Sequence, residues 1–209
     1  MIRRPIIASI PSALALLTVS CINVNIPLGG DSASTAVVWM LDRPVPDPWG
    51  VSSDYVIRVK DFSSIQILQR VDMIVSLEDG SLNRSSTNLW SARPMEVLPD
   101  ELASDLLASG AWGAVLRQAT MLQEDFIVEG FIRRFGGAEA GGVWTAILDV
   151  DITVLSGYDN SLVFQKNYSL SWDLPDPSYF ALAAGMASLV GIFNEEVMGD
   201  IWSTMLPVR

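Results

Sequence analysis

Apolar residues recur at every second position between residues 143 and 155. The even positions from 146 to 154 are apolar, whereas the odd positions include the polar residues Asp149, Asp151 and Thr153. Because successive side chains of a strand point to opposite faces, this pattern predicts a strand with one buried and one wet face. The alternation recurs over residues 162–172. Further apolar runs predict strands at residues 36–41, 54–62, 71–78 and 125–135, with a glycine-rich hairpin loop at residues 136–142.

Two segments have the spacing of a helix. In the first, predicted at residues 99–109, leucines recur every four residues, proline and two acids suit the first turn, and Gly110 suits the end. The second, residues 178–205, has apolar residues three and four apart. The elements together predict an α+β fold: a single-domain, two-layer sandwich with a mostly antiparallel sheet and helices on one face.

The N-terminus has the features of an export signal. Arg3 and Arg4 precede a short apolar stretch, which is too short to span a membrane, and residues 1–20 are therefore a predicted signal peptide. The Ser20-Cys21 junction resembles a bacterial lipobox, which implies that Cys21 carries the lipid anchor, including palmitate-like acyl chains. The alternative is an ordinary signal peptide that leaves an unmodified cysteine.

Residues 21–34 comprise the lipidated cysteine and a segment of mainly Asn, Pro, Gly, Asp and Ser, which predicts a flexible tether with a reach of ~40 Å. Residues 35–209 form the single predicted domain. The residue after the cysteine is Ile22, not the Asp that commonly retains such proteins at the inner membrane. By that analogy, the predicted location is the periplasmic face of the outer membrane.

Composition narrows the possible functions. The net charge is −11, and without residues 1–20, which hold two arginines and no acid, it becomes −13. Such a surface repels phosphate, so nucleic acid is not an expected partner. The chain has no histidine and only one cysteine, which excludes Ser-His-Asp and Cys-His catalysis and histidine- or thiolate-based zinc sites. We expect no metal and no cofactor.

Asp149 and Asp151 share one strand face, as a carboxylate pair for acid–base catalysis would. An exposed strand of an acidic protein produces the same pattern, and the sequence therefore predicts a protein that is not an enzyme. A more informative segment is residues 180–193, in which Ser188 is the only clearly polar residue. Its predicted partner-contact residues are Phe180, Ala183, Ala187 and Gly191, where small side chains permit close approach of another subunit. The alternative is that this helix packs flat on the sheet.

Several short motifs follow one another along the chain. They are Val38-Trp39-Met40-Leu41, Asp72-Met73-Ile74-Val75, Asn88-Leu89-Trp90-Ser91-Ala92-Arg93-Pro94, Ser109-Gly110 and Asp125-Phe126-Ile127-Val128-Glu129-Gly130. In this order after a lipobox, they resemble the ABC-type transport auxiliary lipoprotein component family. In that family Trp90 and Pro94 are architectural residues, and no catalytic residue is carried over.

The resemblance implies an adaptor of an ABC transporter whose periplasmic subunit is of the mammalian-cell-entry type and which moves lipid between the two membranes. The predicted partners are therefore that subunit, the transporter subunits, the membrane through the lipid anchor, and a second copy of the chain. An assembly lipoprotein that pilots or plugs an outer-membrane barrel is the alternative function. A periplasmic hydrolase is a third.

Overall fold

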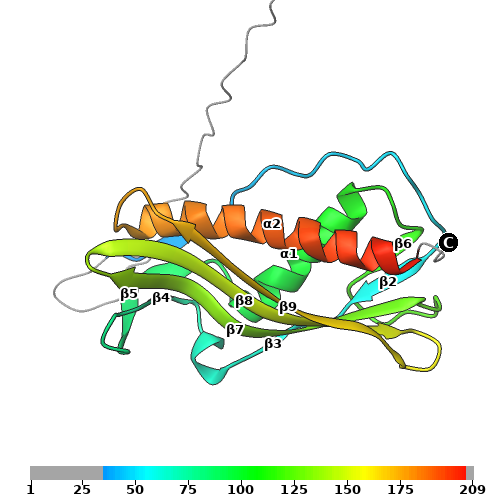
Figure 1. The fold of residues 1–209 in the computed structure, drawn as a ribbon, viewed down its shortest axis with the longest axis horizontal. Helices are drawn as coiled ribbons and strands as arrows, with labels where there is room; N and C mark the ends of the chain where they lie inside the picture. Colours follow the sequence, from blue (N-terminus) through cyan, green and yellow to red (C-terminus); the bar gives the residue numbers. More distant parts are fainter. Residues whose placement is uncertain (1–34, 206–209) are drawn as a thin grey trace, which may run out of the picture.

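The computed structural model describes residues 35–205, so the predicted signal peptide, Cys21 and the tether lie outside the described residues. Figure 1 shows one curled sheet with two helices on its concave side. The elements in chain order are β1 (Val37–Trp39), β2 (Val56–Val59), β3 (Ser63–Ser64), η1 (Gln66–Leu68), β4 (Asp72–Ser76), β5 (Leu82–Trp90), α1 (Pro94–Ala108), β6 (Ala114–Leu116), β7 (Phe126–Ala140), β8 (Val143–Ser156), β9 (Leu162–Asp173) and α2 (Tyr179–Met205).

The sheet is built around the long strand β7. On one side, β7, β8 and β9 form an antiparallel meander. On the other side, β2, β3 and β4 pair in parallel with successive parts of β7, while β5 pairs antiparallel with β4, and β1 and β6 add parallel edges. The α+β class is confirmed. The predicted mostly antiparallel two-layer sandwich is wrong, because three segments share one edge of β7 in parallel and the mixed sheet curls into a half-barrel.

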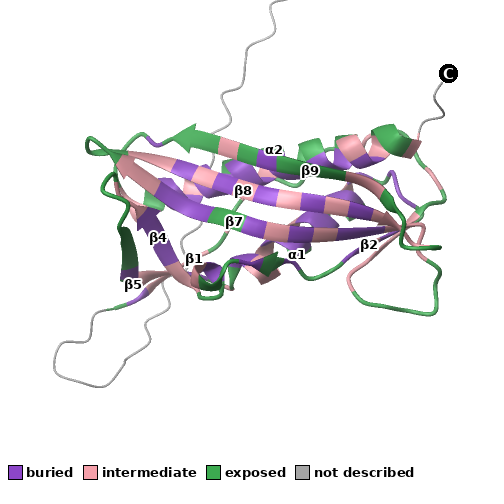
Figure 2. Cartoon of the chain, turned by 60° about the horizontal axis from the view of Figure 1, so that its bottom comes forward, coloured by how far each residue is buried: buried purple, intermediate pink, exposed green. Residues whose placement is uncertain are grey.

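The alternation in β8 places the even residues from 146 to 154 in the core, as predicted. All five even residues are fully buried: Ala146, Leu148, Val150, Ile152 and Val154. The central helix α2 packs on this face and on β9, and its buried residues include Met186, Phe193 and Ile201. Along β8, the buried residues of the inner face alternate with half-buried residues of the outer face (Figure 2). The core therefore lies between the concave face and the two helices.

Two predicted boundaries are wrong. Helix α1 begins at Pro94, not Pro99, and Pro99 lies inside it. Proline at position 94 costs nothing because the first turn has no partner for its N–H, and Pro99 removes only one hydrogen bond while its ring is buried. Strand β7 continues to Ala140, so the hairpin loop shrinks to two glycines, both with positive φ. Gly136 lies within β7. Glycine is required at this position because a Cβ there would be 2.4 Å from the carbonyl oxygen of Ile74.

Candidate functional site

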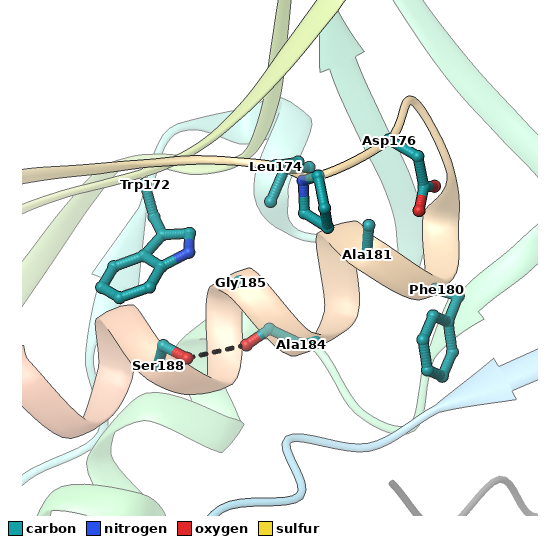
Figure 3. Close-up of a pocket in the computed structure, with 9 residues that line it drawn as sticks. Trp172, Leu174, Asp176, Phe180, Ala181, Ala184, Gly185 and Ser188 are labelled. Carbon is teal, nitrogen blue, oxygen red and sulfur yellow. Dashed lines mark hydrogen bonds between the residues drawn. The ribbon is translucent and has the colours of Figure 1, made fainter. Parts of the chain in front are cut away.

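An apolar groove lies between the first half of α2 and the end of β9 (Figure 3). Its volume is about 230 Å³, and its lining is Trp172, Leu174, Pro175, Asp176, Phe180, Ala181, Ala184, Gly185 and Ser188. Two aromatic side chains lie at its margins. Trp172 is 46 % exposed and Phe180 is 45 % exposed. Exposed aromatic side chains beside a hollow are typical of a surface that binds another chain.

The groove exists because one side of α2 is nearly without side chains. Gly185 lets the helix lie close to the sheet, since a Cβ there would be 2.5 Å from Leu174 Cδ2 and 3.1 Å from Ala146 Cβ. Ala184 and Ser188 form the open side. The Ser188 hydroxyl donates a hydrogen bond to the Ala184 carbonyl oxygen at 3.1 Å, which satisfies that hydroxyl within the helix. The floor of the groove is therefore small and weakly polar.

The predicted partner-contact residues occupy different environments. Phe180 lines the groove, and its ring centroid is 6.0 Å from that of Trp39 in β1. Ala183 and Ala187 are only 3 % and 4 % exposed. Gly191 is half-buried, with open space where a Cβ would stand. Partner contact at these four residues stays a prediction, and two of them, Phe180 and Gly191, reach the surface of the monomer.

The small residues that line the groove, Ala184 and Ser188, lie one position after the predicted Ala183 and Ala187. Sequence reasoning missed them because α2 is apolar on nearly every side between residues 180 and 193, so that the pattern does not single out one face. Ser188, the one clearly polar residue of this stretch, is the signal that could have identified the open side of the helix, because a polar residue in an apolar helix tends to face solvent.

Asp149 and Asp151 lie on the outer face of β8 in a cross-strand network. The Asn167 side-chain amide donates to both carboxylates, at 2.7 and 2.8 Å, and Arg133 Nε donates to Asp151 at 2.7 Å. The hydrogen bond from Arg133 is the main reason that the pKa of Asp151 is lowered. A carboxylate held ionised in this way cannot act as a proton donor near neutral pH. The arrangement is that of a stabilised strand surface.

A buried charged cluster joins the segment of residues 40–55 to both helices, and no pattern in the sequence indicates it. The two terminal guanidinium nitrogens of Arg43 contact the two carboxylate oxygens of Asp105, each at 2.8 Å. One of these nitrogens also lies 2.7 Å from a carboxylate oxygen of Glu101. The Asn194 amide of α2 donates to Asp105 at 2.8 Å. Burial alone would lower the pKa of Arg43, but the hydrogen bonds and charges of Asp105 and Glu101 outweigh it and raise the pKa.

Residues 42–198 match the model of the ABC-type transport auxiliary lipoprotein component family. The chain belongs to this family. Two solved structures share the fold of the auxiliary lipoprotein. Protein XCC0632 from Xanthomonas campestris is 19 % identical, with a TM-score of 0.71, over 81 % of this chain and 95 % of that one. An uncharacterised protein is 13 % identical, with a TM-score of 0.61, over 74 % of this chain and 95 % of that one. None of the curated proteins compared with the chain matches it significantly.

Two further observations describe the auxiliary lipoprotein. Between residues 35 and 205, no group of three or more His, Cys, Asp or Glu side chains is placed to hold a metal ion. Helix α2 is long and apolar enough to cross a membrane by length and composition, but 61 % of its most apolar window is buried inside the fold. That degree of burial, with the core contacts of α2 to β8 and β9, identifies it as the central helix of the domain.

Proposed function

We propose that this chain is a lipid-anchored adaptor of an ABC-type system that moves lipid between the two membranes. Its anchor is Cys21, exposed after removal of residues 1–20, and residues 22–34 tether the domain to the periplasmic face of the outer membrane. Its direct partner is a mammalian-cell-entry-type periplasmic protein. The observation that carries the proposal is the family match over residues 42–198, downstream of a lipobox-like Ser20-Cys21 junction.

The surface of the domain supports an adaptor that binds proteins. The charge of −13 without residues 1–20 disfavours contact with anionic headgroups. Along α2, exposed or half-buried apolar positions run from Phe180 through Ala184 to Gly191 and Ile192, and Ile192 is 37 % exposed. Burial of apolar area gains about 25 cal/mol per Å², so this strip favours association with another apolar surface.

The test is co-purification of the tagged full-length protein from envelopes solubilised in mild detergent. We expect a mammalian-cell-entry-type protein, a permease and an ATPase to be recovered with the wild-type chain. Recovery of an outer-membrane barrel in their place would contradict the proposal and favour the assembly-lipoprotein alternative.

A matched pair of variants locates the contact. A Cβ at either Gly191 or Gly199 meets nothing within 4 Å, and both residues lie in α2, so both positions have open space where a side chain would start. Gly191→Glu places a charge in the apolar strip and should abolish recovery of the partners. Gly199→Glu, farther along the helix, should leave recovery unchanged. Equal recovery with the two variants would show that the strip is not the contact surface.

A further inference from the structure

Strand β9 has a free edge along its whole length. It pairs with β8 on one side, and within residues 35–205 no backbone hydrogen bond reaches its other side. The strand has 12 residues, a length of ~40 Å, and every second residue directs its N–H and C=O outward. Free edges are usually blunted by proline, bulges or several charges. In β9 the register shifts only at the start of the strand, between Leu162 and Phe164, and the single lysine of the strand, Lys166, is bound to Asp200.

The apolar groove lies at the C-terminal end of this free edge, where Trp172 is its one lining residue from β9. A strand added to β9 would lie alongside the open side of α2, over Ala184 and Ser188, and its alternate side chains would enter the space between Trp172 and Phe180. The small residues of α2 leave room for such side chains. The occupant that fits is therefore an extended segment with apolar residues at every second position.

The chain contains such a segment outside the described residues. Residues 22–26 read Ile-Asn-Val-Asn-Ile, so three apolar residues share one face of an extended chain. The eight residues that follow, 27–34, span up to ~27 Å. The described chain begins at Thr35, two residues before β1, and Trp39 at the end of β1 touches Phe180 of the groove. The segment can therefore reach the groove of its own domain.

We propose that residues 22–26 of this chain add as a further strand to the free edge of β9 and place Ile22, Val24 and Ile26 in the groove beside α2. Backbone hydrogen bonds to the edge would supply affinity, and the apolar side chains would fix the register. Gly191 and Ile192, farther along α2, remain for the partner.

The consequence for the membrane rests on the proposed lipidation. Cys21 directly precedes the docked segment, so docking would hold the lipid at the groove end of the domain. The domain would then meet the membrane in a fixed orientation, because residues 27–34 would become a loop between the docked segment and Thr35 and no free tether would separate Cys21 from the domain. The docking itself does not need the lipid, and the two proposals can therefore fail separately.

The test is disulfide formation in the full-length protein in its own membrane. Val24→Cys is combined either with Ser188→Cys in the groove or with Ser203→Cys as the control. Both serines are exposed residues of α2 whose hydroxyls bind a preceding backbone carbonyl, and they are 15 residues, ~22 Å, apart. On mild oxidation we expect at least tenfold more intramolecular cross-link with position 188 than with position 203. The same ratio is expected in a Cys21→Ser background.

Equal cross-linking of the two pairs, or none, would overturn the proposal, and a disulfide-linked dimer through position 188 would assign the groove to a second copy. Amide hydrogen exchange provides a measurement without cysteines. The outward amides at the groove end of β9 should exchange at least tenfold faster in Val24→Pro than in wild type, because proline removes an N–H from the added strand. Asn25→Ser, which keeps the alternation, should exchange as wild type does. Fast exchange in all three proteins would also overturn the proposal.

Discussion

Replacing Asp105 with alanine should destabilise the domain more than any surface substitution. The side chains of Asp105 and Arg43 are 5 % and 8 % exposed, and Asn194, which donates to the same carboxylate, is fully buried. Loss of the carboxylate leaves a buried guanidinium without its main partner and a buried amide without its acceptor. Breaking such a pair typically costs about 3–5 kcal/mol. Because Glu101, with a 29 % exposed side chain, still binds Arg43, we expect about 3 kcal/mol.

The assay is urea unfolding of the mature chain with Cys21→Ser, followed by circular dichroism. With a slope of about 1–3 kcal/mol/M, a loss of about 3 kcal/mol moves the midpoint down by about 1–3 M. Glu129→Ala is the control, because Lys60 and Glu129 form an exposed pair with side chains 45 % and 40 % exposed, typically worth less than about 1 kcal/mol. Equal losses for Asp105→Ala and Glu129→Ala would refute the reasoning.

Two further predictions concern a packing contact and an ion pair. Gly130→Ala should lower the free energy of unfolding by about 1–3 kcal/mol, because a Cβ there would lie 2.6 Å from ring carbons of the buried Phe62. Gly199→Ala, in an open helical site, should raise the free energy of unfolding by about 0.5–1 kcal/mol. Thermal unfolding of the two variants and the wild type measures both effects. Burial alone would raise the pKa of Asp200, but the hydrogen bonds from Lys166 and Tyr168, together with the charge of Lys166, outweigh it and lower the pKa. The stability from this carboxylate is therefore present above its unfolded pKa of about 3.9 and is lost as pH falls further, so Asp200→Asn should lose less stability than wild type between about pH 5 and pH 2 in acid titrations.

Elements with a regular apolar period could be predicted from the sequence. The alternation of β8 placed its even residues in the core, and the spacing of α2 gave its bounds to within one residue. Strand β5 was missed because its residues, Leu-Asn-Arg-Ser-Ser-Thr-Asn-Leu-Trp, are mostly polar and only two of them are buried. Its structure depends on pairing with β4 and β1, a long-range property that local pattern does not report.

The arrangement of strands and the groove were beyond sequence reasoning for a related physical reason. Periodicity tells which face of a strand is buried, but not which strand lies beside it, and so the parallel pairing of β2 and β4 with β7 could not be inferred. The glycine-rich start of the predicted loop is strand because Gly136 allows β4 to approach β7. Likewise, the open side of α2 depends on how the helix rotates on the sheet.

The central claim is that Cys21 anchors this protein to a membrane, and labelling with palmitate tests it most directly. Cells expressing the wild-type chain or Cys21→Ser are labelled and separated into soluble periplasmic, inner-membrane and outer-membrane fractions. We expect labelled wild-type protein in the outer membrane, and unlabelled Cys21→Ser protein in the soluble periplasmic fraction. Wild-type protein without label, together with Cys21→Ser protein that still sediments with outer membranes, would contradict the account.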